Sequence, residues 1–146
     1  MRVFRNKYPA RSLTLRVGMG TTTTNSIEVS ATCRYEEAHS DPVAGHFLFS
    51  YRITITNHGA TTVQLLRRHW TIHDSLTAVR EVEGPGVVGE TPVLGPGQSY
   101  SYTSACDLRS GLGRMNGTYL MVTRPGGTHF QVVVPTMQLR YPFSAN

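Results

Sequence analysis

Apolar and polar residues alternate along most of the chain, which is the period of β-strands that bury one face. The alternation is strict over residues 27–35 and over residues 47–56. The run at 57–60, Asn-His-Gly-Ala, is typical of a turn, and we expect it to join residues 47–56 in a hairpin to a strand over residues 62–74. Further strand patterns lie at residues 75–83, 99–106, 118–124 and 130–139.

Two interruptions of the alternation predict irregular strands. Leu65 and Leu66 belong to opposite faces although they are neighbours, so we expect a β-bulge between them. Pro135 has no N–H to donate to a neighbouring strand, and it therefore marks a bulge, a sheet edge or a break within the last strand. Glycine is frequent over residues 84–97 and 109–117. We expect residues 84–97 to be a long ordered loop or an irregular edge, and residues 109–117 to be a loop.

About seven short strands separated by turns predict an all-β fold, a single antiparallel β-sandwich. The length of 146 residues suits one domain with a core of its own. No apolar run approaches the roughly 20 residues that span a bilayer, and no secretory signal pattern begins the chain. We therefore expect no membrane span and a cytoplasmic location.

The net charge of +5 belongs to the N-terminal end of the chain. Residues 1–17 hold five basic residues and no acidic one, while the charges of the remaining chain balance. We expect residues 1–21 to be a basic tail and linker, with the small polar run 18–25 leading into a folded domain over residues 22–146. Such a tail can contact nucleic acid, an anionic partner or a membrane surface. Nucleic-acid-binding proteins usually spread basic residues over one face, so this distribution argues against nucleic acid as the partner.

Side chains suited to catalysis are sparse. Cys33 and Cys106 lack the short spacing of metal-binding or redox pairs, and we expect both to be free, buried thiols. Neither a G-x-S-x-G nucleophile motif nor a cofactor motif in its required context occurs. We therefore expect a protein that is not an enzyme and that has no cofactor.

The glycine-rich segment 84–89 matches the spacing G-x-G-x-x-G through Gly84, Gly86 and Gly89. In dinucleotide-binding folds these glycines open a helix, whose N-terminal N–H groups bind the pyrophosphate. Here residues 90–92, Glu-Thr-Pro, and a second cluster of glycine and proline follow, so no helix is expected. The glycines therefore indicate a tight loop with positive φ angles.

Two arginines in the strand expected at 62–74 offer an alternative role for this loop. Alternation places Arg68 with Trp70 on one face, which we expect to be the core side, and Arg67 with His69 on the surface side. Either arginine could join residues 84–89 in binding an anion, such as a pyrophosphate-bearing nucleotide. This hypothesis requires one guanidinium to lie beside the loop.

Histidines and aspartates raise the question of a metal site. His69 and His73 lie four residues apart in one expected strand, so their side chains share a face but are about 13 Å apart. That separation is too large for one metal ion, whose ligands lie about 2 Å away. Direct divalent-metal binding therefore needs three or four side chains from different segments to converge. The candidates are His39, Asp41, His46, His69, His73 and Asp74.

Several longer stretches resemble the ApaG family, in order, along residues 22–146. They include FLFSYRITITN at 47–57, VQLLRRHWTI at 63–72, EVEGPGVVGETP at 81–92 and FQVVVPTMQL at 130–139. Ala105 stands where many members have glycine, and residues 1–21 lie outside the family pattern. The resemblance implies a small β-sandwich of immunoglobulin or fibronectin type III likeness. It also implies a link to cobalt and magnesium resistance and, from eukaryotic members, a protein-interaction role.

These observations favour a non-catalytic binding module that recruits an unidentified protein partner. We expect the partner to bind an exposed sheet face or a strand edge, because an open edge offers unpaired backbone groups. Pairing of two copies through an edge is one form of this hypothesis. The alternatives are anion or nucleotide binding at residues 84–89 and direct binding of a divalent metal.

Overall fold

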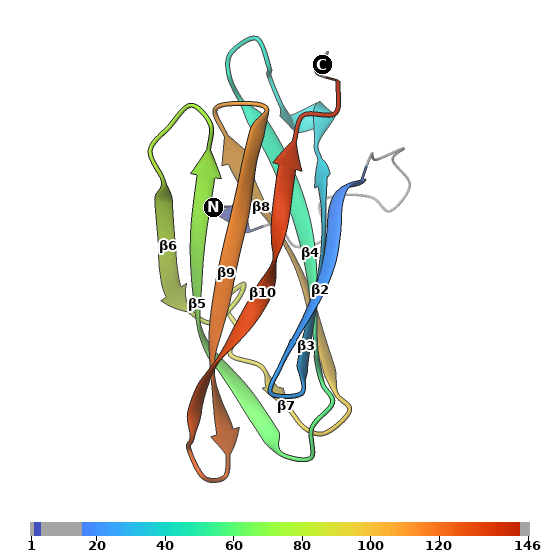
Figure 1. The fold of residues 1–146 in the computed structure, drawn as a ribbon, viewed down its shortest axis with the longest axis vertical. Helices are drawn as coiled ribbons and strands as arrows, with labels where there is room; N and C mark the ends of the chain where they lie inside the picture. Colours follow the sequence, from blue (N-terminus) through green and yellow to red (C-terminus); the bar gives the residue numbers. More distant parts are fainter. Residues whose placement is uncertain (1, 4–15, 144–146) are drawn as a thin grey trace.

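Two antiparallel β-sheets packed face to face form the protein in the computed structural model, which describes residues 2–3 and 16–143 (Figure 1). The first sheet has the strand order β1 (Arg2–Val3), β8 (Ser99–Leu108), β4 (Phe47–Asn57), β3 (Ile27–Tyr35) and β2 (Arg16–Thr24). The second has the order β10 (His129–Arg140), β9 (Leu112–Arg124), β5 (Thr62–Asp74) and β6 (Arg80–Pro85), and β7 (Val93–Leu94) also pairs with β5. This architecture confirms the predicted all-β sandwich.

Helical structure is confined, in the described part of the chain, to the short 3-10 helix η1 (Glu37–His39). Over the same residues, no helix has the length and the apolar character needed to cross a membrane.

The expected hairpin between residues 47–56 and 62–74 is wrong, because β4 and β5 belong to different sheets. β4 pairs with β3 and β8, whereas β5 pairs with β9, β6 and β7. The Asn57 side chain holds the crossing between the sheets, since its Nδ2 donates to the carbonyl oxygens of Thr61 at 2.9 Å and Leu94 at 3.0 Å. Both strands bury one apolar face, and packing those faces against each other builds the core.

The expected linker at 18–25 is also wrong over most of its length, because residues 16–24 form β2. β2 pairs with β3 from Thr24↔Ile27 upward, and the turn residues Asn25 and Ser26 both have positive φ. The four consecutive threonines at 21–24 have the β-branched side chains that favour a strand, although their polarity suggested a linker. The boundary expected at residue 21 thus falls inside a strand, and residues 4–15 of the basic tail lie outside the described residues.

Both predicted strand irregularities are confirmed. The register of β5 against β9 shifts between Leu65 and Arg67, which makes Leu66 the extra residue of a bulge. The register of β10 against β9 shifts between Val134 and Met137, around Pro135. Each bulge keeps apolar side chains on the core side of a strand that otherwise changes phase.

The loop expected at 109–117 ends early, because β9 begins at Leu112. Its glycines serve close packing and not a turn. A Cβ at Gly113 would lie 2.3 Å from the carbonyl oxygen of His73, and one at Gly117 would lie 2.2 Å from Cε3 of Trp70. The neighbouring strand and the core indole therefore occupy the space that a side chain would need.

Trp70 lies at the centre of the core and is fully buried. Its ring meets Tyr51 at 5.8 Å and Tyr119 at 6.1 Å between centroids, both in edge-to-face geometry. The hydroxyls of Tyr102 and Tyr119 form a buried hydrogen bond that joins β8 of one sheet to β9 of the other. These contacts link the two sheets through their largest side chains.

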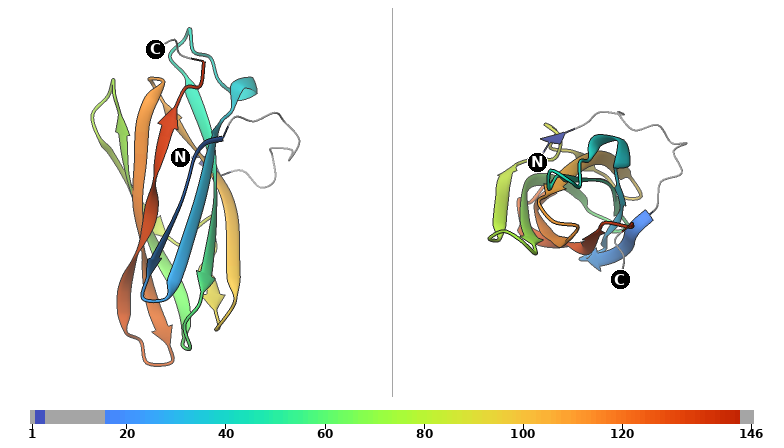
Figure 2. Two further views of the ribbon diagram at one scale, coloured as in Figure 1. Left: turned by 45° about the vertical axis from the view of Figure 1, so that its right-hand side comes forward. Right: turned by 90° about the horizontal axis from the view of Figure 1, so that it is seen from above.

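The two long sides of the sandwich differ. On one side β2 and β10 lie next to each other (Figure 2), where Thr22 Oγ1 donates to the carbonyl oxygen of Val133 at 2.6 Å and the Val133 N–H donates to Thr24 Oγ1 at 3.3 Å. On the other side β6 is an edge that pairs only with β5 among the described strands. On the same side, the outer side of β8 is paired by β1 only at Ser104 and Ala105. Among the described strands, β6 is therefore the long edge with no partner along its outer side, and β8 is an edge that is covered at two residues.

Candidate functional site

The uncovered strand β6 has the sequence Arg-Glu-Val-Glu-Gly-Pro and pairs with β5 from Ile72↔Arg80 to Arg67↔Pro85. Figures 1 and 2 show it at the outer margin of its sheet, with no other described strand beside it. An edge strand carries backbone N–H and C=O groups that have no partner within the sheet. We therefore take β6 and the turn that follows it as the candidate site.

The backbone of β6 directs alternate residues toward the free side. The Gly86 N–H donates to the carbonyl oxygen of Leu66 at 2.8 Å, which sets the phase of pairing with β5. Because hydrogen-bonded and non-hydrogen-bonded pairs alternate in an antiparallel ladder, Glu81 and Glu83 direct their N–H and C=O groups away from β5. Pro85 has the same phase, and its missing N–H leaves no ladder bond unmade.

The side chains of β6 alternate between acidic and apolar. Glu81 and Glu83 point to the outer face, with 67% and 62% of their side chains exposed. Their carboxylates lie 3.7 Å from His69 Nε2 and 3.6 Å from Arg67 Nη2. Val82 points inward between them and packs, half-buried, against the core. The edge therefore offers two carboxylates on one face and an apolar side chain on the other.

Arg80 anchors the start of β6 to the opposite sheet. Its Nη1 lies 3.6 Å from Asp107 Oδ1, and its Nη2 donates to the carbonyl oxygen of Asp107. This bridge ties β6 to β8 on the side of the sandwich that β2 and β10 do not close. It holds the edge in place at one end.

The glycine motif forms a tight turn at the other end of β6. Val87 and Glu90 exchange two backbone hydrogen bonds, of 2.8 and 3.0 Å, around Val88 and Gly89. Both central residues have positive φ, 52° and 77°, as in the turns that connect two-residue hairpins. Gly86 also has positive φ, and a Cβ there would lie 2.3 Å from the Glu90 carbonyl oxygen. The predicted tight loop with positive φ is therefore confirmed for Gly86 and Gly89, whereas Gly84 belongs to β6 and does not have positive φ.

Only one of the two candidate arginines reaches this turn. Arg68 points to the inner face, and its Nη1 donates to the carbonyl oxygens of Pro85 at 2.9 Å and Gly86 at 3.0 Å. Gly84 lies against the same guanidinium, since a Cβ there would be 3.3 Å from it. Arg67 points to the outer face and pairs with Glu83 instead. The structure thus brings Arg68, but not Arg67, together with the glycines.

The charge of Arg68 has an unusual environment. Its Nε is buried and has no hydrogen-bond partner, and over residues 2–3 and 16–143 no carboxylate lies within ion-pair distance of its guanidinium. Its contacts within the turn are carbonyl oxygens, so the guanidinium clamps the turn while its charge stays unneutralised. Alternation in β5 explains why the neighbouring arginines differ, because the bulge at Leu66 returns Arg68 to the core phase.

The six candidate metal ligands do not converge. In the described part of the chain, which includes all six, no group of three or more His, Cys, Asp or Glu side chains could hold a metal ion. His69 faces Glu81, and Asp74 is engaged by neighbouring hydrogen-bond donors. The convergence that direct metal binding requires is therefore missing from these residues.

Asp74, at the end of β5, joins the loop between β5 and β6 to the loop between β8 and β9. It is 7% exposed, and its carboxylate accepts hydrogen bonds from the N–H of Arg109 at 2.6 Å, the Ser110 hydroxyl at 2.7 Å and the N–H of Leu76 at 3.2 Å. Burial by itself raises the pKa of Asp74, but the Ser110 hydroxyl and the backbone N–H groups outweigh burial and lower the pKa below its ordinary value. This carboxylate has a structural role at the junction of two loops.

Cys33 and Cys106 are free and buried, as predicted. Burial raises the pKa of each thiol to about 11, so neither is a thiolate at neutral pH. The thiolate is the reactive form of cysteine, and neither side chain has the environment of a catalytic nucleophile.

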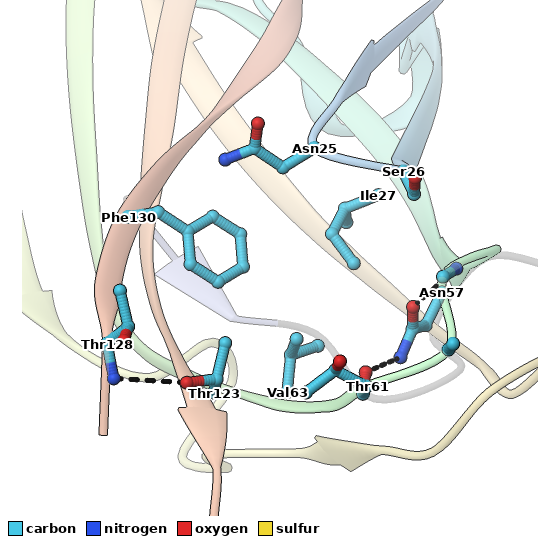
Figure 3. A pocket seen from close by; sticks show the side chains of 11 residues that line it. Asn25, Ser26, Ile27, Asn57, Thr61, Val63, Thr123, Thr128 and Phe130 are labelled. Carbon is cyan, nitrogen blue, oxygen red and sulfur yellow. Dashed lines mark hydrogen bonds between the residues drawn. The ribbon is translucent and has the colours of Figure 1, made fainter. Parts of the chain in front are cut away.

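A hollow lies at the end of the sandwich where three turns meet (Figure 3). This hollow has a volume of about 340 Å³ and a floor of Ile27, Val63 and Phe130. Its polar residues include Asn57, whose amide is occupied by backbone partners, and Thr123, whose Oγ1 accepts the N–H of Thr128 at 3.0 Å. None of its lining side chains is charged, so it offers no charge for recognising an ion.

Comparison with known proteins identifies the family. The model of the ApaG domain matches residues 37–123. Protein ApaG of Paramagnetospirillum magneticum is 48% identical over 120 residues, which cover 82% of this chain and 92% of that protein. Protein ApaG of Methylobacterium nodulans is 47% identical over 119 residues, covering 82% and 91%. The chain belongs to the ApaG family.

A solved structure of a related protein agrees with the described architecture. The crystal structure of an ApaA protein from Bordetella pertussis superposes with a TM-score of 0.77 at 41% identity, and the match covers 81% of this chain and 95% of that one. The matched ApaG domain, residues 37–123, includes β6, the glycine turn and both arginines. The candidate site therefore lies within the part that defines the family.

Sequence reasoning anticipated the turn and Arg68 and allowed an irregular edge over residues 84–97, but it did not identify β6, at residues 80–85, as the edge strand. The signal was present in the alternation of Glu81, Val82 and Glu83 and in Pro85, which suits an edge strand. The pattern could not reveal which strands would flank it. That depends on the order of strands in the sheet.

Proposed function

We propose that this ApaG-family protein is a non-catalytic binding module that recruits a protein partner by adding an extended segment of that partner to β6. The observation that carries the proposal is the free side of β6, where Glu81 and Glu83 direct unpaired backbone groups outward. Strand addition to an exposed edge is a recurrent mode of peptide recognition, in which backbone hydrogen bonds supply affinity and alternate side chains supply specificity.

The other strand edges support this choice. The edges of β2 and β10 lie against each other, joined by the hydrogen bonds of Thr22 and Thr24 with the backbone of Val133. β1 is two residues long and pairs with Ser104 and Ala105 in the middle of β8, so the outer side of β8 is interrupted by a strand, whereas the outer side of β6 is not. β6 is anchored at both ends, by Arg80 to Asp107 and by the turn that Arg68 clamps. An edge that is rigid before binding loses less conformational freedom when a partner docks.

The proposed role makes any connection with cobalt or magnesium tolerance indirect, acting through the partner and not through an ion held by this chain. The buried, protonated thiols fit a reducing compartment, and we propose that the protein acts in the cytoplasm. Neither proposal requires catalysis by the described side chains.

The test compares two variants of one residue. Glu83→Pro removes an N–H on the free side and leaves the ladder with β5 intact, whereas Glu83→Gln keeps the N–H. The intact chain and both variants are used to capture proteins from the cells that express it, and captured proteins are quantified by mass spectrometry. We expect one set of proteins to be retained by the wild type and Glu83→Gln and lost by Glu83→Pro. Equal capture by all three, or no specific capture, would overturn the proposal.

A second candidate function is binding of an anion, such as a pyrophosphate-bearing nucleotide, beside the turn at residues 84–89. The observation that favours it is the Arg68 guanidinium, which lies next to Gly84 and Gly86 without a carboxylate partner among the described residues. The carbonyl oxygens that the turn directs at Arg68 argue for a structural role of the same group. The two roles make different predictions for added anions.

A thermal-shift titration with inorganic pyrophosphate and ATP separates these roles. A ligand at 100 times its Kd stabilises the native state by about 2.7 kcal/mol. Anion binding predicts a rise in Tm that Arg68→Gln abolishes and Arg67→Gln retains. An unchanged wild-type Tm at millimolar concentrations would leave Arg68 with its structural role alone.

A further inference from the structure

Resting on the proposed function, we infer what kind of segment β6 accepts. It is an extended segment of a different protein that carries a lysine or arginine, then an apolar residue, then a second lysine or arginine. The inference also states what β6 excludes, which is the β6 strand of a second copy of this chain.

The basic positions follow from Glu81 and Glu83. Residues that direct their backbone groups to the same edge place their side chains on the same face, so both carboxylates stand on the outer face beside any added strand. The residues opposite them would have Cβ atoms about 5 Å from those of the glutamates. Opposite charges at that spacing stabilise a strand pair, and like charges destabilise it. His69 and Arg67 contact the carboxylates from the β5 side, which leaves the far side of each open to the incoming strand.

The apolar position follows from Val82. This side chain lies on the inner face between the two glutamates and is only partly covered by the core. A residue paired with Val82 belongs to a non-hydrogen-bonded pair on the free side, where Cα atoms approach to about 4.5 Å and side chains pack closely. An apolar, β-branched residue there would complete the cover of Val82.

A second copy of the chain is excluded by its own sequence. In an antiparallel pair, hydrogen-bonded residues that lie opposite each other both direct their N–H and C=O groups toward the partner strand. On the free side of β6 only Glu81, Glu83 and Pro85 do so. A two-fold axis between two β6 strands must therefore pass through a residue and not between two residues. A centre anywhere within residues 80–83 places Arg80 opposite its copy or a glutamate opposite a glutamate. A centre on Gly84 requires an N–H from Pro85, which has none. Charge and proline thus protect the edge against self-pairing, as in other natural sheets.

Selection from displayed random peptides of about ten residues, longer than a typical strand, tests the inference directly. The bait is the intact chain, and a parallel selection uses the double variant E81K/E83K. We expect peptides enriched on the wild type to share the pattern basic–apolar–basic, and peptides enriched on E81K/E83K to replace the basic residues with acidic ones. A wild-type peptide should bind the double variant at least about tenfold more weakly, because two attractive pairs become repulsive.

The matched control is E28K/E37K, which changes the net charge equally on the other sheet and on η1. It should leave peptide affinity within about twofold of the wild type, because distant exposed charges are screened. E81Q/E83Q should fall between the wild type and E81K/E83K, and it keeps the test informative if the charge reversal perturbs folding. Enriched peptides without the pattern, or equal loss in E28K/E37K, would overturn the inference.

Two further measurements separate this inference from the proposed function. Hydrogen exchange should slow at the Glu81 and Glu83 amides when a selected peptide binds, since strand addition occupies those groups. Protection there by peptides that lack basic residues would uphold strand addition and overturn the specificity. Light scattering should give the mass of a monomer, and a dimer that Glu83→Pro dissociates would overturn the exclusion of a second copy.

Discussion

Gly117 lies directly beneath the indole of Trp70, so closely that a Cβ at Gly117 would stand 2.2 Å from Cε3 of the ring. The glycine is in the middle of β9, where a residue without a side chain normally weakens a strand. Here the space that a side chain at position 117 would fill is occupied by the indole of Trp70, which is fully buried between the sheets. One residue thus sets the position of the largest side chain in the core.

Gly117→Ala should therefore destabilise the protein strongly, because neither the strand backbone nor the packed indole can yield. We expect a loss of about 3 kcal/mol in the free energy of unfolding, at the upper end for overpacking. Urea denaturation followed by Trp70 fluorescence measures it. Gly18→Ala is the control, since a Cβ there would meet Cys33 Sγ at an ordinary 3.4 Å, and it should change stability by less than about 0.5 kcal/mol.

The hydrogen bond between Tyr102 and Tyr119 should show coupling in a double-mutant cycle. Tyr102→Phe leaves the buried Tyr119 hydroxyl without this partner and should reduce stability by about 1–3 kcal/mol. Tyr102→Phe combined with Tyr119→Phe should lose less than the sum of the single changes, because no hydroxyl is then left unpaired. Strict additivity would contradict a direct interaction between the two hydroxyls.

The same tyrosines predict how stability depends on alkaline pH. Burial raises the pKa of Tyr102 and Tyr119 well above the ordinary value. A group whose pKa is raised by folding stabilises the native state fully below its unfolded pKa, and that contribution is lost as pH rises above about 10. Absorbance at alkaline pH should therefore report ionisation of these side chains only as the protein unfolds. Titration of every tyrosine within the folded protein would contradict their burial.

Asp74 predicts a loss of stability in acid. Its pKa is lowered in the folded protein, so its contribution is present above the unfolded value of about 3.9 and is lost as pH falls below it. Asp74→Asn should reduce stability at pH 7 by about 1.5–3 kcal/mol and flatten the acid limb of a stability profile measured by urea denaturation. Asp41→Asn is the matched control, because the exposed carboxylate of Asp41 accepts the N–H of Ala44 at 3.3 Å, and it should change stability at pH 7 by less than about 0.5 kcal/mol.

Two glycines of the turn after β6 should respond differently to alanine. Gly89 has positive φ and open space around it, so Gly89→Ala should lose about 1 kcal/mol through backbone strain alone. Gly86 has positive φ and would place a Cβ 2.3 Å from the Glu90 carbonyl oxygen, so Gly86→Ala should lose more, about 3 kcal/mol. Thermal unfolding of the two variants gives the order. Equal effects would show that the turn relaxes around a new side chain.

Much of the fold was predictable because side chains in a strand alternate with a period of two. That period located β3 and β4 almost to the residue and predicted the bulge at Leu66, since a single extra residue reverses the face of every later side chain. It also separated Arg67 from Arg68, which pair with Glu83 and with the glycine turn respectively. The candidate anion site was predictable to this extent, while its occupancy stays a prediction.

The misassigned segments share one physical cause. The composition of a segment does not tell which distant residues pack against it in the folded protein. Residues 18–25 have the polarity of a linker, yet threonines 21–24 form part of a strand because β3 and β10 lie on either side of them. The glycines at 113 and 117 suggested a loop, yet they lie in β9. They are glycines because His73 and Trp70 occupy the space that their side chains would need.

The amino-acid sequence by itself determined most of the strands, their inward and outward faces, the bulges and the tight turn, because these depend on backbone geometry over a few residues. It did not determine β2 or the start of β9. Only the tertiary structure decided that β4 and β5 face each other from separate sheets, that β2 and β10 cover each other and that β6 stays open. Those outcomes depend on which distant strands bury one another's apolar faces. The alternation of side chains within each strand does not specify the order of the strands in the sheets.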